Sequence, residues 1–351
     1  MSQTPIRVGI AGLGRSGWNM HAHTLATLPE HYQVVAAMDF SPERRNDAAV
    51  KFGAKTYDSY EALLADESVE LVVVATPNSA HKSNVVAALQ AGKHALCEKP
   101  FGTTSAEADE MIAAALQSGK IVAPFQNRRY EAHFQKVREL VESGILGEIH
   151  LIRIGMHNFN RRWDWQTLKE FSGGYLNNWG PHIIDQALQL MHLEDDAPDP
   201  EMWVDLQNVL SSGDAEDHIK MVLRAPNSPT IDIELSSAVA FGQDRWNIAG
   251  KNGGLRGSST KLEWKWVDWS QMPERPIDRE PTVGRSYNSE TLEWQHGSWS
   301  AGENTDADLM HDFYRELFDT VRNGKPLTVT PQSVRRQISL IEKAKEMTGF
   351  A

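Results

Sequence analysis

The chain has 351 residues, with 35 basic and 47 acidic side chains and a formal net charge of −12. Hydrophobic residues make up 40% and charged residues 23%, which is typical of soluble globular protein and excludes a disordered or fibrous chain. The negative charge argues against a nucleic-acid or anionic-membrane surface, and no apolar run approaches the roughly 20 residues of a membrane span. The single cysteine, Cys97, excludes an internal disulfide framework. The first residues lack the charged and apolar segments of a secretory signal, so we expect a cytoplasmic protein.

The first third of the chain alternates short apolar runs with helical segments. Residues 69–76 are apolar almost throughout, as expected of a strand covered on both faces. Ser41, Pro42 and Gly53 are placed to begin and end one of the helices. The expected strands are 6–11, 33–39, 69–76, 94–100 and 121–126, and the expected helices run from the first glycine turn towards 28 and over 41–53, 79–91 and 103–118. This alternation predicts parallel βαβ units over residues 1–125.

The pattern changes after about residue 127. A helix at 131–143, a long strand at 148–159 and a helix ending near 193 precede a linker expected at 194–201. Runs typical of strands then follow without intervening helices, at 202–210, 218–225, 230–240, 245–250 and 261–269. We therefore expect residues 126–305 to form an α+β substrate-binding and oligomerisation domain with a largely antiparallel sheet. Helical patterns at 306–322 and 330–348 predict C-terminal helices, within 306–351, that pack back on the body.

A glycine turn follows the first expected strand. Gly12, Gly14 and Gly17 match G-x-G-x-x-G, and the turn opens the first helix, where backbone N–H groups and the helix dipole can hold a pyrophosphate. Asp39 ends the second strand 22 residues after Gly17, where a carboxylate can accept hydrogen bonds from ribose hydroxyls. This context predicts a Rossmann domain. The charge of Asp39 favours NAD over NADP, although two arginines follow closely at positions 44 and 45.

Polar residues follow two further strands of the expected parallel sheet. Thr76, Pro77 and Asn78 come after one strand, and Glu98 and Lys99 come at the end of the next. Open α/β sheets bind ligands at this carboxyl edge, so we expect these residues at the cofactor. Capping the next helix is an equal alternative for Asn78. Most lysines are surface charges, but the apolar strand before Lys99 and the proline after it direct this one into the cleft.

The segment 173–185, GGYLNNWGPHIID, is the other informative stretch. Pro181 fits only the first turn of a helix, which predicts a helix beginning near Asn177 or Asn178. Asn178 and His182 are then four residues apart on one face. The helix N-terminus disfavours imidazolium and leaves a neutral base, although a single histidine at such a position is more often a structural residue.

Together these motifs resemble the glucose–fructose oxidoreductase, inositol dehydrogenase and rhizopine-catabolism family (Gfo/Idh/MocA). The resemblance covers nearly the whole chain, and it rests on GLGRSG, Asp39, ATPNSAH at 75–81, CEKP at 97–100, QNRRY at 126–130, segment 173–185 and NGKPLTVTPQSVRRQISLI near the end. It implies a Rossmann domain followed by an α/β domain whose open sheet commonly forms an oligomer interface. A homodimer or homotetramer is therefore expected. It also implies nicotinamide-dependent oxidation or reduction of a small-molecule carbohydrate, polyol or related ring.

The resemblance also implies roles for single residues. Lys99 takes the place of the lysine that binds the reacting hydroxyl and assists proton transfer, and His182 takes the place of the general base. The family usually has an aspartate where this chain has Asn178, and an amide can orient a hydroxyl or imidazole but carries no proton or charge. Asp185 and Asp164 are the nearest carboxylates in the sequence that could replace it.

The expected cofactor-binding residues are Gly12, Leu13, Gly14, Arg15, Ser16, Asp39, Thr76, Pro77, Asn78, His81, Glu98, Lys99 and Asn127. The expected substrate-binding residues are Lys99, Arg162, Trp163, Asn178 and His182, and the expected catalytic residues are Lys99, His182 and Asn178. Tryptophan faces suit sugar C–H surfaces and arginines suit carboxylates, so the segment 161–165 raises an anionic sugar as one substrate. Simple packing of these tryptophans, beside solvated arginines, is an equal alternative.

Two other groups of residues receive ordinary interpretations. Trp264 and Trp266 share one face of an expected strand, which favours packing in the core or at a subunit interface. His21 and His23 have the spacing of a metal pair on a strand but lie in the first expected helix, so no metal site is predicted.

Three functions from different classes remain open. NAD-dependent dehydrogenation of a sugar or polyol is the first. The second is a glycoside hydrolase that oxidises the sugar transiently with tightly held NAD and eliminates the leaving group. The third is a nucleotide-binding regulator without catalysis, against which the presence of both Lys99 and His182 argues.

Overall fold

The computed structural model describes residues 4–193, 197–280, 284, 286–302 and 305–350. Within them, one sheet has six parallel strands in the order β3-β2-β1-β4-β5-β6, the order of a doubly wound fold. Its strands are β1 (Ile6–Ala11), β2 (Tyr32–Met38), β3 (Lys55–Tyr57), β4 (Leu71–Val74), β5 (His94–Cys97) and β6 (Val122–Pro124). The predicted α/β class and parallel sheet are thus confirmed. The three-residue strand β3 was not predicted, because two of its three side chains are exposed and it carries no apolar pattern.

Helices cover both faces of this sheet, as the alternation predicts. They are α1 (His23–Ala26), α2 (Pro42–Phe52), α3 (Tyr60–Leu64), α4 (His81–Gln90) and α5 (Ser105–Ser118). Ser41 caps α2 by accepting a hydrogen bond from Arg44 N, and Gly53 ends it in the left-handed conformation. The first predicted helix differs, since a π-helical segment, Ser16–Ala22, follows the glycine turn before α1 begins.

The second sheet has eight strands among the described residues, in the order β14-β13-β12-β11-β7-β10-β9-β8. The strands are β7 (Ile149–His157), β8 (Glu201–Gln207), β9 (His218–Arg224), β10 (Thr230–Ser236), β11 (Trp246–Gly250), β12 (Gly253–Gly257), β13 (Lys261–Val267) and β14 (Trp294–Ser300). All neighbours pair antiparallel except β7 and β10, so the predicted largely antiparallel sheet is confirmed. The expected linker at 194–201 begins with residues 194–196, which lie outside the described residues.

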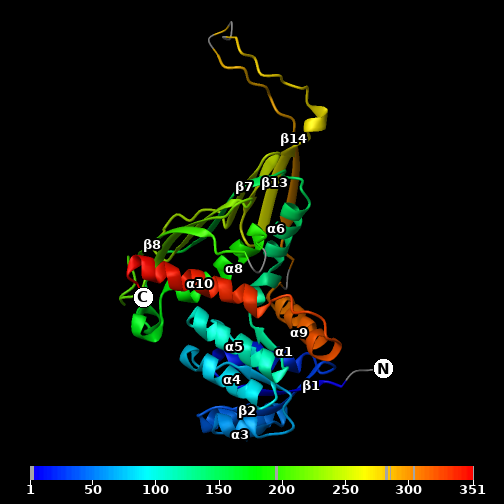
Figure 1. Cartoon of the computed structure of the whole chain (residues 1–351), viewed down its shortest axis with the longest axis vertical. Helices are drawn as coiled ribbons and strands as arrows, with labels where there is room; N and C mark the ends of the chain where they lie inside the picture. Colours follow the sequence, from blue (N-terminus) through cyan, green and yellow to red (C-terminus); the bar gives the residue numbers. More distant parts are fainter. Residues whose placement is uncertain (1–3, 194–196, 281–283, 285, 303–304, 351) are drawn as a thin grey trace.

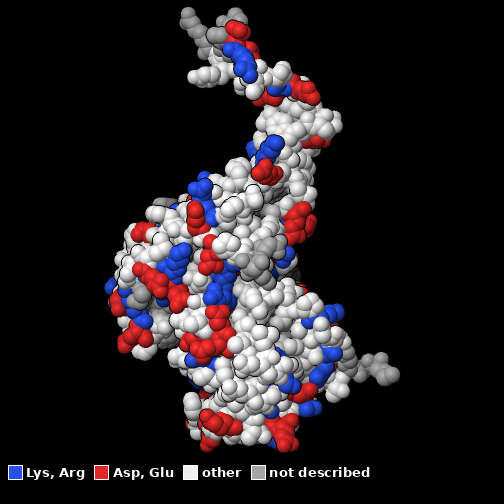
Figure 2. Space-filling view, viewed as in Figure 1, with Lys and Arg blue, Asp and Glu red and all other residues white. Residues whose placement is uncertain are grey.

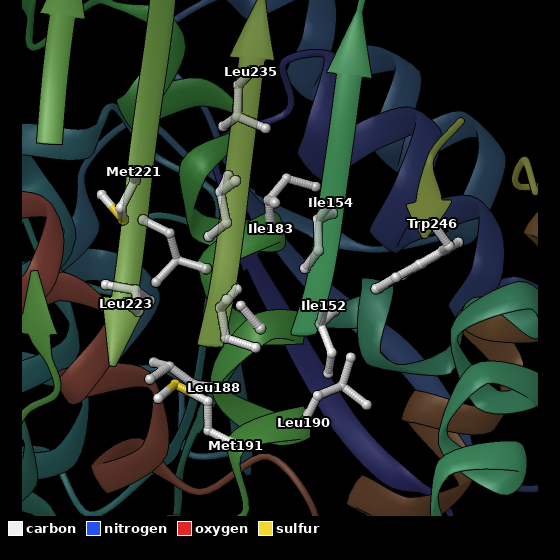
Figure 3. Close-up of a cluster of buried hydrophobic side chains, with 14 of the residues drawn as sticks. Ile152, Ile154, Ile183, Leu188, Leu190, Met191, Met221, Leu223, Leu235 and Trp246 are labelled. Carbon is white, nitrogen blue, oxygen red and sulfur yellow. The ribbon is translucent and has the colours of Figure 1, made fainter. Parts of the chain in front are cut away.

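Two helices cover the inner face of the second sheet, α6 (Ala132–Glu142) and α8 (Gly180–Met191). Figure 3 shows side chains of β7, β9 and β10 pointing at α8, among them Ile152, Met221 and Leu235 facing Ile183 and Leu188. The other face of the sheet has no helix over it in Figure 1.

The two C-terminal helices are α9 (Thr305–Asn323) and α10 (Pro331–Thr348). Phe313 and Tyr314 of α9 pack in the core beside the first sheet. Helix α10 contacts α5 on one side and α8 and β8 on the other, so it joins the two halves of the molecule. Figure 1 shows these halves stacked along the long axis, with described residues of the β13–β14 connection extending beyond them.

No helix among the described residues is long and apolar enough to cross a membrane. On the face drawn in Figure 2, acidic and basic side chains are interspersed.

Candidate active site

Two adjoining cavities lie at the carboxyl edge of the first sheet. The first, of about 1010 Å³, is lined by Gly12, Gly14 and Asp39, and we call it the glycine-loop cavity. The second, of about 710 Å³, is lined by Lys99, His182 and other residues from both halves of the molecule, and we call it the Lys99 cavity. Both linings include Arg15, Ser16, Ala75, Thr76, Asn78, Trp165 and Ser172. The two cavities therefore meet along one continuous surface.

The three glycines of the turn have different reasons to be glycine. A Cβ on Gly12, whose φ is +91°, would lie 2.4 Å from the carbonyl oxygen of Ala75, and one on Gly17 would lie 1.8 Å from that of Gly12. A Cβ on Gly14 would meet no atom within 4 Å, because it would enter the open glycine-loop cavity. Gly12 and Gly17 thus allow the chain to turn tightly, and Gly14 keeps the cavity clear.

Asp39 is nearly buried beside this turn. Its Oδ2 accepts a hydrogen bond from Leu13 N at 2.8 Å, and its Oδ1 accepts one from Ser41 N at 2.9 Å. Arg44 also lines the cavity and lies 3.5 Å from Asp39 Oδ2, whereas Arg45 binds the backbone oxygens of residues 39 and 40. Both carboxylate oxygens thus fix the turn, and each retains lone pairs for a ligand.

These residues fit a dinucleotide. The space in front of Gly14 lies at the start of a helical segment, where free backbone N–H groups attract phosphate, and the carboxylate lies at the next strand end. The second cavity continues from the first towards Lys99, which matches an elongated molecule with its reactive half at the lysine.

Glu98 is buried at the junction of the cavities. Its Oε1 accepts hydrogen bonds from Ser16 Oγ and lies 3.0 Å from His21 Nε2, and its Oε2 accepts one from Lys99 N. His21 Nδ1 in turn lies 2.6 Å from the hydroxyl of Tyr314 on α9. Burial raises the pKa of Glu98, but these hydrogen bonds and the nearby His21 outweigh burial and lower it to about 2. Glu98 is thus a fixed negative charge.

Lys99 is partly buried and reaches across to the second half of the molecule. Its Nζ donates to Asn178 Oδ1 at 3.1 Å and to Asn178 O at 3.2 Å. Burial, followed by the positive charges of Arg128 and Arg15, lowers the pKa of Lys99, while Glu98 opposes that shift. The predicted proximity of Lys99 and Asn178 is therefore present in the structure.

His182 lines the same cavity and is buried. Its Nδ1 is buried without a hydrogen-bond partner in the described part of the chain, so Nε2 is the nitrogen that can face the cavity. Burial, then the charges of Lys99 and Arg128, lowers the pKa of His182 well below its ordinary value. The imidazole is thus neutral at neutral pH and able to accept a proton.

The local fold around Asn178 differs from the predicted single helix. A four-residue helix, α7 (Tyr175–Asn178), ends at Asn178, and α8 begins at Gly180 with Pro181 in its first turn. The predicted start near 177 was therefore wrong by two to three residues. The extra turn exists because Glu216 holds the N-terminus of α7, accepting a hydrogen bond from Leu176 N at 3.0 Å. Asn178 and His182 lie on consecutive helices, and both line the Lys99 cavity.

Most other predicted cofactor residues lie at the cavities. Pro77 and Asn78 line the glycine-loop cavity, and Asn127 lines the Lys99 cavity. Asn78 makes no side-chain cap of the next helix. His81 lies 2.8 Å from Pro100 O and 2.9 Å from Thr76 O, so it ties together the loops after two neighbouring strands. Leu13 contributes its backbone N–H, and its side chain is in the core.

Of the two predicted substrate residues in the 161–165 segment, only one lines a cavity. Arg162 lines the Lys99 cavity, but its guanidinium already binds Asp164 at 2.8 and 2.9 Å and Gln166 at 2.6 Å. Trp163 is 80% exposed and lines neither cavity, so its prediction as a substrate residue is not supported. The reason is that Asp164 caps a 3-10 turn, which redirects the chain and brings Trp165 to both cavities instead.

Neither carboxylate considered as a replacement for the family aspartate serves that role. Asp185 is buried in a two-bond ion pair with Arg129, at 2.5 and 2.8 Å, and Asp164 binds Arg162 near the surface. His21 and His23 likewise have separate partners, Glu98 with Tyr314 for the first and Lys51 for the second. No group of three or more potential metal ligands occurs among the residues that were described.

Several lining residues were not predicted from the sequence. They are Arg128, Asn158, Asn160, Gln166, Tyr175, Trp179 and Ser237 at the Lys99 cavity, and Phe40 and Tyr60 at the glycine-loop cavity. Arg128, Tyr175 and Trp179 lie inside the quoted motifs, which was the available signal. Asn158, Asn160 and Ser237 follow two paired strands, and no sequence pattern marked them.

Comparison with known proteins agrees with this architecture. Residues 6–126 match the model of the oxidoreductase family's NAD-binding Rossmann fold, and residues 134–256 match the GFO/IDH/MocA C-terminal domain. An uncharacterized oxidoreductase of Schizosaccharomyces pombe is 32% identical over 71% of this chain and 69% of its own length. The scyllo-inositol 2-dehydrogenase (NADP(+)) IolW of Bacillus subtilis is 26% identical over 97% of this chain and 93% of its own.

Solved structures give the same result. The crystal structure of an NAD-binding protein from Listeria innocua superimposes with a TM-score of 0.80 at 27% identity, over 99% of this chain and 98% of that one. Both halves of the chain thus match in sequence and in fold. The chain belongs to the GFO/IDH/MocA family and is an oxidoreductase with an NAD-binding Rossmann domain.

Proposed function

We propose that the protein oxidises a hydroxyl-bearing carbon of a sugar, polyol or sugar derivative. The observation that supports this most is the meeting of Lys99, Asn178 and His182 in a cavity continuous with the glycine-loop cavity. When bound, NAD supplies the acceptor for the hydride that leaves the carbon. The relative named as a scyllo-inositol 2-dehydrogenase supports a polyol or sugar as the substrate class.

The chain's own residues supply binding and proton transfer. The Lys99 ammonium, held by two oxygens of Asn178, donates a hydrogen bond to the reacting hydroxyl oxygen. The neutral imidazole of His182 accepts the hydroxyl proton at Nε2 as the C=O bond forms. The amide of Asn178 orients the lysine but takes no proton. A relay of two members, Lys99 and His182, therefore replaces the family's relay of three, in which an aspartate stands at the position of Asn178.

For the cofactor we propose NAD rather than NADP. The Asp39 carboxylate lies at the glycine-loop cavity and would repel a 2′-phosphate. Arg44 at 3.5 Å from that carboxylate opposes the preference, and one relative is named for NADP(+). The choice between NAD and NADP depends on the Asp39 carboxylate, because two backbone N–H groups hold both of its oxygens in place.

We also propose the wider organisation expected from the sequence. Residues 1–125 form the Rossmann domain, 126–305 the substrate-binding domain, and 306–351 the helices that pack back on both. Copies of the chain associate through the outer face of the second sheet into a homodimer or homotetramer. The protein acts in the cytoplasm on a small molecule.

The test is an assay with free sugars, polyols and aryl glycosides, following NADH absorbance and aglycone release. We expect net NADH with at least one free sugar or polyol. Release of aglycone without net NADH would replace this proposal with the glycoside hydrolase, and nucleotide binding with neither reaction would replace it with the regulator.

A variant of the lysine makes the assay specific. Lys99→Met should lower turnover by roughly 10²–10⁴-fold, because the hydrogen bond to the reacting oxygen is lost. NAD binding, measured by calorimetry, should change little. Turnover near that of the unaltered enzyme would show that Lys99 is not at the reacting oxygen.

A further inference from the structure

The Lys99 cavity is positively charged in a negatively charged protein. Its lining includes four cationic side chains, Arg15, Lys99, Arg128 and Arg162, against one carboxylate, Glu98, while the whole chain carries −12. The Glu98 carboxylate is already bound by Ser16, His21 and the Lys99 backbone. The side chains that line the cavity thus carry more positive than negative charge.

Three of these cations already have roles. Arg15 belongs to the glycine turn and lines both cavities, which places it for the phosphates of the cofactor. Lys99 is held at Asn178, and the guanidinium of Arg162 binds Asp164 and Gln166. Arg128 remains, and its side chain is 34% exposed.

Arg128 is held rigidly beside the reacting groups. Its guanidinium carbon lies 4.9 Å from the ring centroid of Trp179, the residue that joins the helices of Asn178 and His182. The ring of Trp179 lies 6.1 Å from that of His182. Stacking on an aromatic face fixes the plane of a guanidinium and leaves its edge available.

The donors of Arg128 are mostly unused within the described residues. A guanidinium has five N–H donors, and the hydrogen bond found for Arg128 is the one from Nη1 to Glu131. Glu131 is shared, because it also lies 3.1 Å from His133 Nε2 and accepts from Gln186 Nε2 at 2.9 Å.

The same carboxylate is linked to a second arginine through Gln186. Arg245 is half-buried and donates to Gln186 Oε1 at 3.0 Å, and Gln186 Nε2 donates to Glu131. Glu131 is therefore engaged by several groups, and it occupies one of the five donors of Arg128.

We propose that Arg128 is the anchor of an anion subsite, so that the preferred substrate is a carboxylated sugar or polyol, such as a uronic or aldonic acid. The guanidinium binds the carboxylate through two parallel N–H donors, a geometry that an ammonium cannot offer. The donors of Arg128 that Glu131 leaves unused suit the two oxygens of one carboxylate. This inference rests on the proposed function, and it replaces Arg162 and Trp163 as the basis for an anionic substrate.

The test compares substrates that differ only in the charged group: glucuronate with glucose, galacturonate with galactose, and gluconate with glucitol. We expect kcat/KM to favour the acid of the preferred pair by about 10–100-fold, the effect of one charged hydrogen-bonded contact. Arg128→Gln should remove this preference mainly through KM, and Arg128→Lys should retain part of it. Arg138→Gln, which removes a surface arginine paired with Glu142 on α6, is the matched control and should keep the preference.

Binding is measured in parallel by tryptophan fluorescence with NAD present, because Trp179 lies beneath Arg128. If the unaltered protein binds the sugar acid and Arg128→Gln does not, the subsite is supported. If no NADH forms in addition, the proposed function is wrong but the subsite stands. Equal or better use of the neutral partner, with NADH formed, overturns the subsite and leaves the function intact. Absence of acid binding, or a preference for glucose 6-phosphate over glucuronate, overturns the carboxylate assignment. Arg128 variants are compared only where thermal unfolding and NAD binding match the unaltered protein, and Arg128→Lys provides the comparison if Arg128→Gln does not fold.

Discussion

At the scale of single residues, the amide of Asn178 determines the charge balance of the site. Lys99 Nζ donates to two neutral oxygens of this residue. Burial and neighbouring cations lower the pKa of both Lys99 and His182, and the charge of Glu98 opposes this shift at the ammonium of Lys99. The site therefore favours the neutral imidazole of His182, and it also makes the ammonium of Lys99 easier to deprotonate.

Asn178→Asp should shift the pH dependence of turnover. The new carboxylate, about where Oδ1 lies 3.1 Å from Lys99 Nζ, stabilises the protonated forms and raises the pKa of Lys99 and of His182. Because the base must be neutral, the acidic limb of kcat should move to higher pH. Profiles at saturating NAD measure this.

Asn178→Ala is the matched comparison for this shift. It removes the oxygen that orients the lysine, so it should lose turnover without moving the acidic limb upward. If both variants match the unaltered enzyme in rate and profile, Asn178 does not contact the reacting groups.

A second residue-scale prediction concerns Asp39. Asp39→Ala should weaken NAD binding by about 1.5–3 kcal/mol, roughly 10–100-fold in Kd, and narrow the gap to NADP. Asp39→Asn is the informative partner, because its oxygen can still accept from Leu13 N and keep the turn in place. Titrating both variants with NAD and with NADP separates the loss of ribose binding from the loss of support for the turn. An unchanged Kd for NAD in either folded variant would contradict ribose binding by Asp39.

At the scale of elements, the short helix α7 depends on a carboxylate beneath it. Glu216 accepts from Leu176 N, and its backbone oxygen accepts from Tyr175 N at 2.8 Å. Gly174 precedes the helix with φ +102° and ψ 155°, a conformation that is essentially restricted to glycine. A Cβ there would lie 2.2 Å from Glu216 Oε1.

Gly174→Ala should therefore destabilise the protein and displace Asn178. The backbone alone costs about 1–3 kcal/mol, and the contact with Glu216 adds to this. Gly119→Ala, at the end of α5, is the control, because its φ is +64° with no atom within 4 Å of the new Cβ. Both variants should lose Tm, the first more than the second, and only Gly174→Ala should lose turnover. Equal losses of Tm with full activity in both would mean that α7 does not position the site.

The same elements show how far sequence patterns reach. Strands with continuous apolar runs were predicted well, since burial on both faces dictates their composition: β1 has the predicted ends, and β4 is two residues shorter at each end than predicted. β12 and β14 were missed because GGLRG and WQHGSWS carry no apolar alternation. They are strands because they pair on either side of β13, and β14 does so from 27 residues further along the chain.

Site residues follow the same distinction. Lys99, Asn178 and His182 could be placed together from two motifs. The support of Glu98 by Tyr314 could not, because it depends on how α9 packs 216 residues further along the chain. The link from Glu131 through Gln186 to Arg245 was equally invisible, since Arg245 immediately precedes β11 of the second sheet.

At the scale of the whole molecule, the Lys99 cavity lies between two halves that α10 holds together. Arg335 of α10 binds Asp109 of α5 at 2.9 and 3.0 Å, and Glu342 accepts from Ser105 at the start of α5. On its other side α10 packs on α8, which carries His182. The distance between the lysine of one half and the histidine of the other is thus set partly by the C-terminal helix.

The outer face of the second sheet has no helix over it in the described part of the chain (Figure 1). On this face Lys220 of β9 lies 2.6 Å from Asp232 and 3.1 Å from Glu234, both of β10, so acidic and basic side chains of neighbouring strands form ion pairs. Beside them Trp203, 57% exposed, is opposite Val222 on the neighbouring strand. Apolar side chains among paired charges suit an interface between two copies of the chain, because such a face is complementary to itself.

Val222→Lys tests this interface. In a single chain the new lysine would be opposite Asp232 and partly exposed, so its effect on the free energy of unfolding should stay within about 1 kcal/mol. In an interface the same charge would be buried against a second copy, and the assembly should dissociate. Light scattering should give the mass of two or four chains for the unaltered protein and of fewer chains for the variant. Val50→Lys, at a 79% exposed position on α2, should leave the mass unchanged. A single-chain mass for the unaltered protein, or an undisturbed oligomer in Val222→Lys, would place the interface elsewhere or exclude it.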